Sequence, residues 1–131
     1  MNVAVIQPRS GQVTAIRGFD TAANEVEAAA LSQFIREIPQ GQIVIVATQG
    51  WDAASFFNAE TLASLQSLGL ASHALTPPFA AIGVKGASAG TALQAVGDNN
   101  NTAYLRVGLS PDTRNLAAAV DKVMIVRPLL D

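Results

Sequence analysis

The chain has 131 residues, of which 50% are hydrophobic and only 14% are charged. Eight basic and ten acidic residues give a net charge of −2, which excludes the clustered Lys and Arg of a typical nucleic-acid-binding surface. The length suits one domain with a single core. The absence of cysteine excludes disulfides, thiol catalysis and thiolate metal sites.

The hydrophobic fraction is mostly small, because it includes 24 alanines while aromatic residues make up 5%. No apolar run approaches the roughly 20 residues of a membrane-spanning helix. Residues 1–6 lack the basic segment that precedes the apolar stretch of a signal peptide. We therefore expect a soluble chain without a membrane span, located in a virion or cell-surface assembly or otherwise in the cytoplasm.

The first third predicts a hairpin followed by an amphipathic helix. Residues 3–6 are apolar, and 12–17 alternate so that Val13 and Ala15 share one face. Asp20 or Thr21 can cap a helix over 22–38, which Pro39 and Gly41 end. One apolar stripe on this helix contains Val26, Ala30, Leu31, Phe34, Ile35 and Ile38.

The middle of the chain predicts a buried strand, a second helix and a further strand. Residues 43–47 form an unbroken β-branched run, typical of a central strand covered on both faces. Asn58 is a good N-cap for a helix that ends at Gly69. A strand over 79–84 follows a diproline.

The last third is harder to assign. Residues 91–96 allow a short helix, 103–108 alternate as a strand, 110–112 open another helix, and 123–126 form a closing strand. The predicted fold class is therefore α+β: a compact single domain of small, mostly antiparallel β-sheets flanked by short helices.

Motifs for catalysis, cofactors and metals are missing. His73 is the single histidine and lies in no nucleophile elbow, so we interpret it as a loop or surface residue. One histidine without cysteine cannot build a usual zinc site. Lys85 precedes the glycines of 86–90 rather than following them, unlike the lysine of a phosphate-binding loop. We expect no enzyme, no cofactor and no metal.

The loop after the predicted central strand leaves two interpretations open. An indole face at Trp51 can stack on a sugar ring while the Asp52 carboxylate accepts from hydroxyls. Alternatively, Trp51 is a core plug and Asp52 caps the residues that follow it. Composition alone favours the second interpretation.

The order of several segments resembles the interleukin-like EMT inducer (PANDER-like) family, which includes the stem domain of protein O-mannose N-acetylglucosaminyltransferase. The resemblance covers residues 2–86 and extends more loosely to about 109. It suggests an interleukin-like EMT inducer-type domain over 1–109 and a C-terminal extension, a helix and a strand packed on the same domain, over 110–131. The segments that carry it are 2–6, 10–13, 17–21, 34–44, 67–69 and 79–86.

The resemblance implies a non-catalytic fold and lectin-like behaviour toward N-acetylglucosamine-type glycans. Of three polar positions in the stem domain, the acid after the central strand matches Asp52. The arginine before the next strand falls at Thr76, and the arginine ahead of the first strand has no counterpart. The expected ligand-binding residues are therefore Asp52, Trp51 and Lys85, and the secreted animal members carry cysteines that this chain lacks.

Two function hypotheses follow. The first is a lectin-like recognition or adhesion module that binds a glycan and is presented on a larger assembly. The second is a purely structural virion, tail or surface-layer subunit without a sugar site. Low charge and many small apolar residues suit subunit contacts, so we expect protein partners, a homo-oligomer and a phage or bacterial source.

Overall fold

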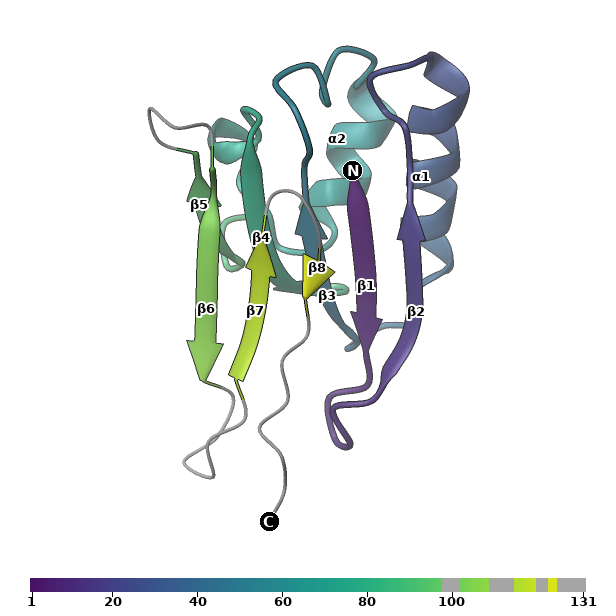
Figure 1. Cartoon of the computed structure of the whole chain (residues 1–131). Helices are drawn as coiled ribbons and strands as arrows, with labels where there is room; N and C mark the ends of the chain where they lie inside the picture. Colours follow the sequence, from purple (N-terminus) through teal and green to yellow (C-terminus); the bar gives the residue numbers. More distant parts are fainter. Residues whose placement is uncertain (98–101, 109–114, 120–122, 125–131) are drawn as a thin grey trace.

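A five-stranded antiparallel sheet forms the centre of the computed structural model, which describes residues 1–97, 102–108, 115–119 and 123–124. The strand order is β2-β1-β3-β4-β5, so β3 is central, as the sequence predicts (Figure 1). Every neighbouring pair in this sheet is antiparallel. The strands are β1 (Asn2–Ile6), β2 (Val13–Gly18), β3 (Ile43–Ala47), β4 (Phe79–Val84) and β5 (Leu93–Val96).

Two helices cover the rear face of this sheet in Figure 1, namely α1 (Glu25–Glu37) and α2 (Ala59–Gln66). A short 3-10 helix, η1 (Ser72–Ala74), follows α2. Alternation along the strands points one set of side chains toward the helices, and these build the larger hydrophobic cluster. Its fully buried members include Val3, Leu31, Ile35, Val44, Val46, Leu65, Leu68, Leu70 and Phe79.

A second sheet packs on the opposite face, in front of the first in Figure 1. It consists of β6 (Tyr104–Gly108), β7 (Asn115–Ala119) and β8 (Val123–Met124), in that order. β6 contacts β4 and β5, while β7 and β8 contact β3. The smaller cluster between the sheets contains Ala4, Ile6, Ile45, Ala80, Ile82 and Ala103. The arrangement is a compact α+β domain, as predicted.

Two helix predictions in the last third are wrong. Residues 93–96 form β5, whose backbone pairs with β4, and the Gln94 carboxamide accepts from Ala71 N at 2.6 Å. Residues 115–119 form β7 instead of the helix expected from Ser110, because pairing with β6 overrides the helix propensity of the alanines. Residues 110–114 and the predicted boundary after 109 lie outside the described residues. The predicted closing strand is confirmed for 123–124, and 125–126 also lie outside them.

A β-bulge separates two side chains that the sequence places on one face. The β1–β2 register shifts between Val5 and Ile6, and an extra residue reverses the alternation beyond that point. Val13 therefore packs against the cluster between the sheets, whereas Ala15 packs against the helix-side cluster.

The first helix begins later than predicted, and its buried face is rotated. Asn24, not Asp20 or Thr21, is the N-cap, and its side chain accepts from Glu27 N at 3.0 Å. The buried face contains Ala28, Leu31, Ser32 and Ile35, while Val26 is 73% exposed. Among the described residues, no helix is both long and apolar enough to cross a bilayer.

Gly83 lets β4 pass directly beside the end of α2. A Cβ at this position would lie 2.0 Å from the Leu68 carbonyl oxygen, which already accepts from Val84 N at 3.0 Å. We expect Gly83→Ala to lower the free energy of unfolding by about 2–3 kcal/mol, because a backbone atom cannot move aside as a flexible side chain does. Urea denaturation followed by circular dichroism measures this.

Gly18→Ala is the matched control. Gly18 is also a strand glycine, but the nearest atom to its added Cβ is the Asn2 side-chain oxygen at 3.1 Å. We expect a change within about 0.5 kcal/mol, as is usual for surface positions. Equal losses for the two variants would contradict the packing explanation.

Candidate functional site

One end of the five-stranded sheet gathers three chain segments that are distant in sequence. The antiparallel register pairs Asn2 with Ala47 and Ala47 with Ala80, so the start of β1, the end of β3 and the start of β4 lie together. This end is at the top of Figure 1, and we call it the loop end. The segment between β3 and α2, residues 48–58, lies there and carries Trp51 and Asp52.

The first anchor of this loop is Thr48, which is fully buried. Its backbone N–H donates to Phe79 O at 3.0 Å, and its hydroxyl oxygen accepts from Phe79 N at 2.8 Å. These bonds continue the β3–β4 pairing one residue beyond the end of β3. They fix the position at which the loop leaves the sheet.

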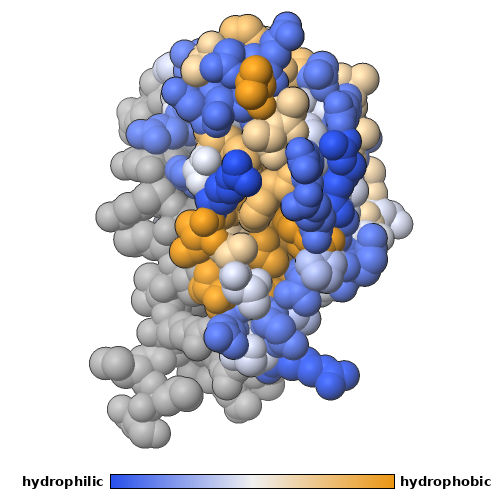
Figure 2. All heavy atoms as spheres, turned by 90° about the vertical axis from the view of Figure 1, so that its right-hand side faces the viewer, coloured by the Kyte–Doolittle hydropathy of each residue, from blue (hydrophilic) through white to orange (hydrophobic). Residues whose placement is uncertain are grey.

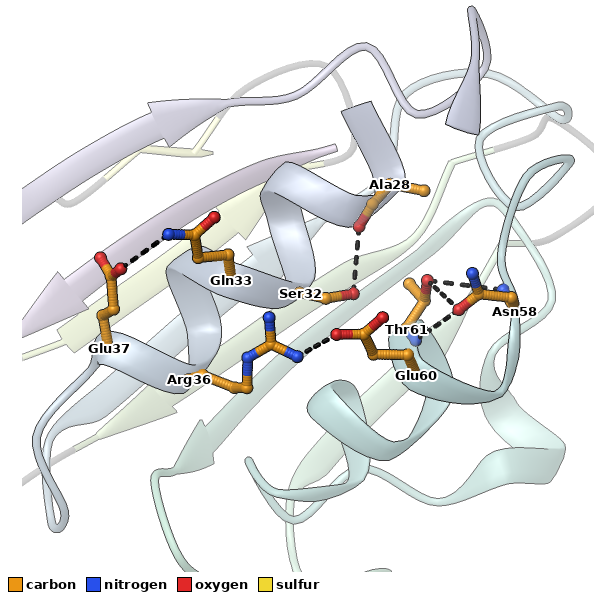
Figure 3. A network of polar contacts seen from close by, with 8 residues as sticks. All are labelled: Ala28, Ser32, Gln33, Arg36, Glu37, Asn58, Glu60 and Thr61. Atoms are coloured by element: carbon orange, nitrogen blue, oxygen red, sulfur yellow. Dashed lines mark hydrogen bonds and ion pairs between the residues drawn. The ribbon is translucent and has the colours of Figure 1, made fainter. Parts of the chain in front are cut away.

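The second anchor is the start of α2 (Figure 3). Asn58 and Thr61 form a capping box, in which the Asn58 side chain accepts from Thr61 N at 3.0 Å and the Thr61 hydroxyl accepts from Asn58 N. Arg36 of α1 pairs with Glu60 beside this cap. The loop therefore runs between two hydrogen-bonded positions.

Between the anchors, the loop buries one face and exposes the other. Ala53 is buried, and Phe57 packs against the helix-side cluster. The Asp52 carbonyl accepts from Ser55 N at 2.9 Å, which closes a turn. The backbone of Gly50 has a φ of +80°, a conformation that glycine adopts readily.

Trp51 is 67% exposed, so the interpretation of this residue as a core plug is wrong. Asp52 is exposed as well, and its side chain makes no hydrogen bond or ion pair with any described residue. The carboxylate lies close to Gly50, because a Cβ built there would be 3.0 Å from Asp52 Oδ1. An exposed indole and an uncommitted carboxylate thus occupy successive positions on an anchored loop.

Lys85 is not part of this arrangement. It follows Val84, which pairs with Ile43 at the start of β3, so it lies at the opposite end of the sheet from Trp51. Only 7% of it is exposed, and its ammonium donates to Ile35 O in the last turn of α1 at 2.5 Å. A cation at the C-terminus of a helix is favoured by the carbonyl dipoles there. Lys85 therefore stabilises the end of α1.

His73 and Thr76, the other residues considered in the sequence analysis, are both exposed. His73 is an exposed residue of η1, in agreement with its interpretation as a surface residue. Thr76 is exposed and precedes β4, so it lies toward the loop end, where Asp52 also lies. In the part of the chain that the structure describes, no three His, Asp or Glu side chains gather into a metal site.

Sequence reasoning missed Thr48, although it holds the loop in place. A threonine directly after a buried β-branched run is an indication that could have suggested it. Because its partner lies in β4, 31 residues away, the sequence does not reveal the bond itself.

Burial lowers the pKa of the Lys85 ammonium below its ordinary value of 10.5, and the positive charge of Arg36 lowers it further. Because the folded pKa lies below the unfolded one, the unfolded chain binds more protons between the two values, and stability rises with pH there. We expect the stability of wild type relative to Lys85→Met to increase from pH 8 toward pH 10.5. Urea titrations of both proteins at several pH values measure this.

The conservative variant Lys85→Arg is the control, since arginine stays protonated over this range. Its stability relative to Lys85→Met is expected to stay constant with pH. A wild-type difference that stays constant too would contradict a lowered pKa.

Comparison with known proteins supports the fold. The family described as interleukin-like EMT inducer matches residues 1–87, which comprise the segment from β1 through α2 and β4 and thus the whole loop end. No curated protein sequence gives a significant match. The family match covers more than half of the chain, and the protein therefore belongs to the interleukin-like EMT inducer family.

Proposed function

We propose that this protein is a non-catalytic, lectin-like recognition module that binds a glycan through Trp51 and Asp52 and is presented on a larger assembly. The observation that carries the proposal is the exposure of Trp51. An indole that is 67% exposed beside an uncommitted carboxylate has no role in the core, whereas the loop around it is anchored at both ends.

The two side chains suit the two kinds of surface on a sugar ring. An indole is a large, rigid apolar plane, onto which the C–H face of a pyranose can stack. A carboxylate accepts short, charge-assisted hydrogen bonds from hydroxyl or amide groups. Because the anchored loop positions both groups before the ligand arrives, little conformational entropy is lost on binding.

The resemblance described above supports an N-acetylglucosamine-type ligand, because Asp52 matches the acidic position of the transferase stem domain. Thr76 stands where that domain has an arginine, so the bidentate grip of a guanidinium is missing. The single-site affinity is accordingly low, and repeated display on an assembly would raise the overall avidity.

The alternative function is a structural subunit without a sugar site. The exposed apolar side chains of Ile16 and Val26, at 67% and 73%, favour it, because such groups suit contacts between subunits. The two functions differ in whether the Trp51 loop meets a ligand, and a direct binding measurement separates them.

Trp51 is the single tryptophan of the chain, so intrinsic fluorescence reports on this loop alone. We expect titration with chitooligosaccharides to shift the emission of wild type as the indole becomes covered. Asp52→Asn is expected to weaken binding about tenfold, the loss that corresponds to about 1.4 kcal/mol for one charge-assisted hydrogen bond. Trp51→Ala should abolish binding, measured by isothermal titration calorimetry.

Tyr104→Ala is the matched control, since Tyr104 is also an exposed aromatic, at 62%, but lies on β6. It is expected to bind as wild type does. A glycan array and a fluorescence titration that both give no signal for wild type would rule out the sugar site and leave the structural alternative.

A further inference from the structure

The outer edge of β2 has no strand beside it in the described structure, because β2 is the terminal strand of the sheet and pairs only with β1. Met1 and Phe19 exchange both backbone hydrogen bonds, at 2.6 and 2.8 Å. Because bonding alternates along an antiparallel pair, Arg17 also bonds toward β1. The N–H and C=O groups of Ile16 and Gly18 therefore point away from the sheet.

This edge is apolar at its centre. Ile16 is 67% exposed and pairs with Ala4, so its side chain lies on the face toward the second sheet. Half-buried Ala15 and Phe34 flank the edge on the helix side. Figure 2 looks onto this flank and shows hydrophobic areas with hydrophilic side chains among and around them. Unpaired backbone groups together with an exposed β-branched side chain are the features that another β-strand recognises.

Arg17 is the only charged residue of β2, and its side chain packs against aromatic rings of the same chain. The Arg17 guanidinium lies over the ring of Phe19 at 4.7 Å and that of Phe34 at 5.8 Å. It is thus directed toward the helix side of the sheet and does not extend across the edge. The approach of a strand to Ile16 is therefore not blocked by this residue.

We propose that a second copy of this chain pairs with β2, edge to edge and antiparallel, about a two-fold axis at Ile16. In this register Ile16 faces Ile16 of the second copy as a hydrogen-bonded pair. Ala15 faces Arg17 of the other copy, and Thr14 faces Gly18, so a small residue meets a larger one at each flanking position. Both copies use the same surface, as a two-fold interface requires.

Electrostatics selects this register over its neighbour. Moving the axis by one residue would place Arg17 directly opposite Arg17 of the second copy, and like charges facing each other across a pair are destabilising. The axis at Ile16 avoids that contact and covers the most exposed apolar side chain of the strand. Strand β1 lies between β2 and β3, so the Trp51 loop stays open in the pair.

The mass in solution tests the pairing. Size-exclusion chromatography with light scattering is expected to give twice the 13.5 kDa chain mass for wild type at high micromolar concentration. Ile16→Glu should give the monomer mass, because two carboxylates would then face each other. Val26→Glu, at an equally exposed aliphatic residue of α1, should leave the dimer intact. A wild-type monomer at millimolar concentration, or a dimer unaffected by Ile16→Glu, would overturn the proposal.

Cysteine cross-linking tests the register without relying on a disruptive change. The chain has no cysteine, and hydrogen-bonded antiparallel partners have Cα atoms about 5.5 Å apart, within the range that a disulfide spans. Ile16→Cys is therefore expected to form a covalent dimer under mild oxidation, well ahead of Arg17→Cys and Val26→Cys. Faster cross-linking of Arg17→Cys than of Ile16→Cys would overturn the axis at Ile16.

The glycan titration keeps the two proposals apart. Ile16→Glu should retain the Trp51 fluorescence response of wild type, because the interface and the loop lie on different strands. A wild-type dimer that binds no sugar would support the β2 pairing and would contradict only the lectin-like proposal. Circular dichroism of Ile16→Glu confirms that the monomer is folded.

Discussion

Burial of β3 on both faces is the constraint on which the rest of this structure depends. Val44 and Val46 point into the helix-side cluster, while Ile45 points into the cluster between the sheets. A strand with two apolar faces needs a cover on each of them. The helices supply one cover and the second sheet the other, so the layers are a consequence of this single run of residues.

The same constraint determines where an exposed loop can form. A chain that leaves a fully buried strand must satisfy its backbone groups at once, because no water reaches them. Thr48 does so through Phe79 of β4, and the capping box at Asn58 does so at the start of α2. The residues between these two points pack against the core on one side only. Trp51 and Asp52 are exposed on the other side.

Local patterns predicted the elements whose signals lie within a few residues. The β-branched run gave β3, and Asn58 gave the start of α2, because strand burial and capping are short-range properties. The prediction of secondary structure was wrong where pairing with a distant strand determines the conformation of a segment. Leu93–Val96 is a strand because β4 offers it an edge, and the alanines of β7 pair with β6 despite their helix propensity.

For the candidate site, the sequence identified Trp51 and Asp52 as neighbours but could not reveal that the indole is exposed. It also could not reveal that Lys85 contacts the end of α1, because this hydrogen bond joins residues 50 positions apart.

The two anchors of the Trp51 loop also separate residues on which the scaffold depends from residues on which it does not. Thr48, Ala53, Phe57 and Asn58 are tied to the sheet, the core or a helix cap, whereas residues 49–52 are exposed. A change in the sequence or the length of this short stretch would therefore leave the scaffold beneath it the same. At the loop end, the exposed side chains can therefore differ while the core stays the same.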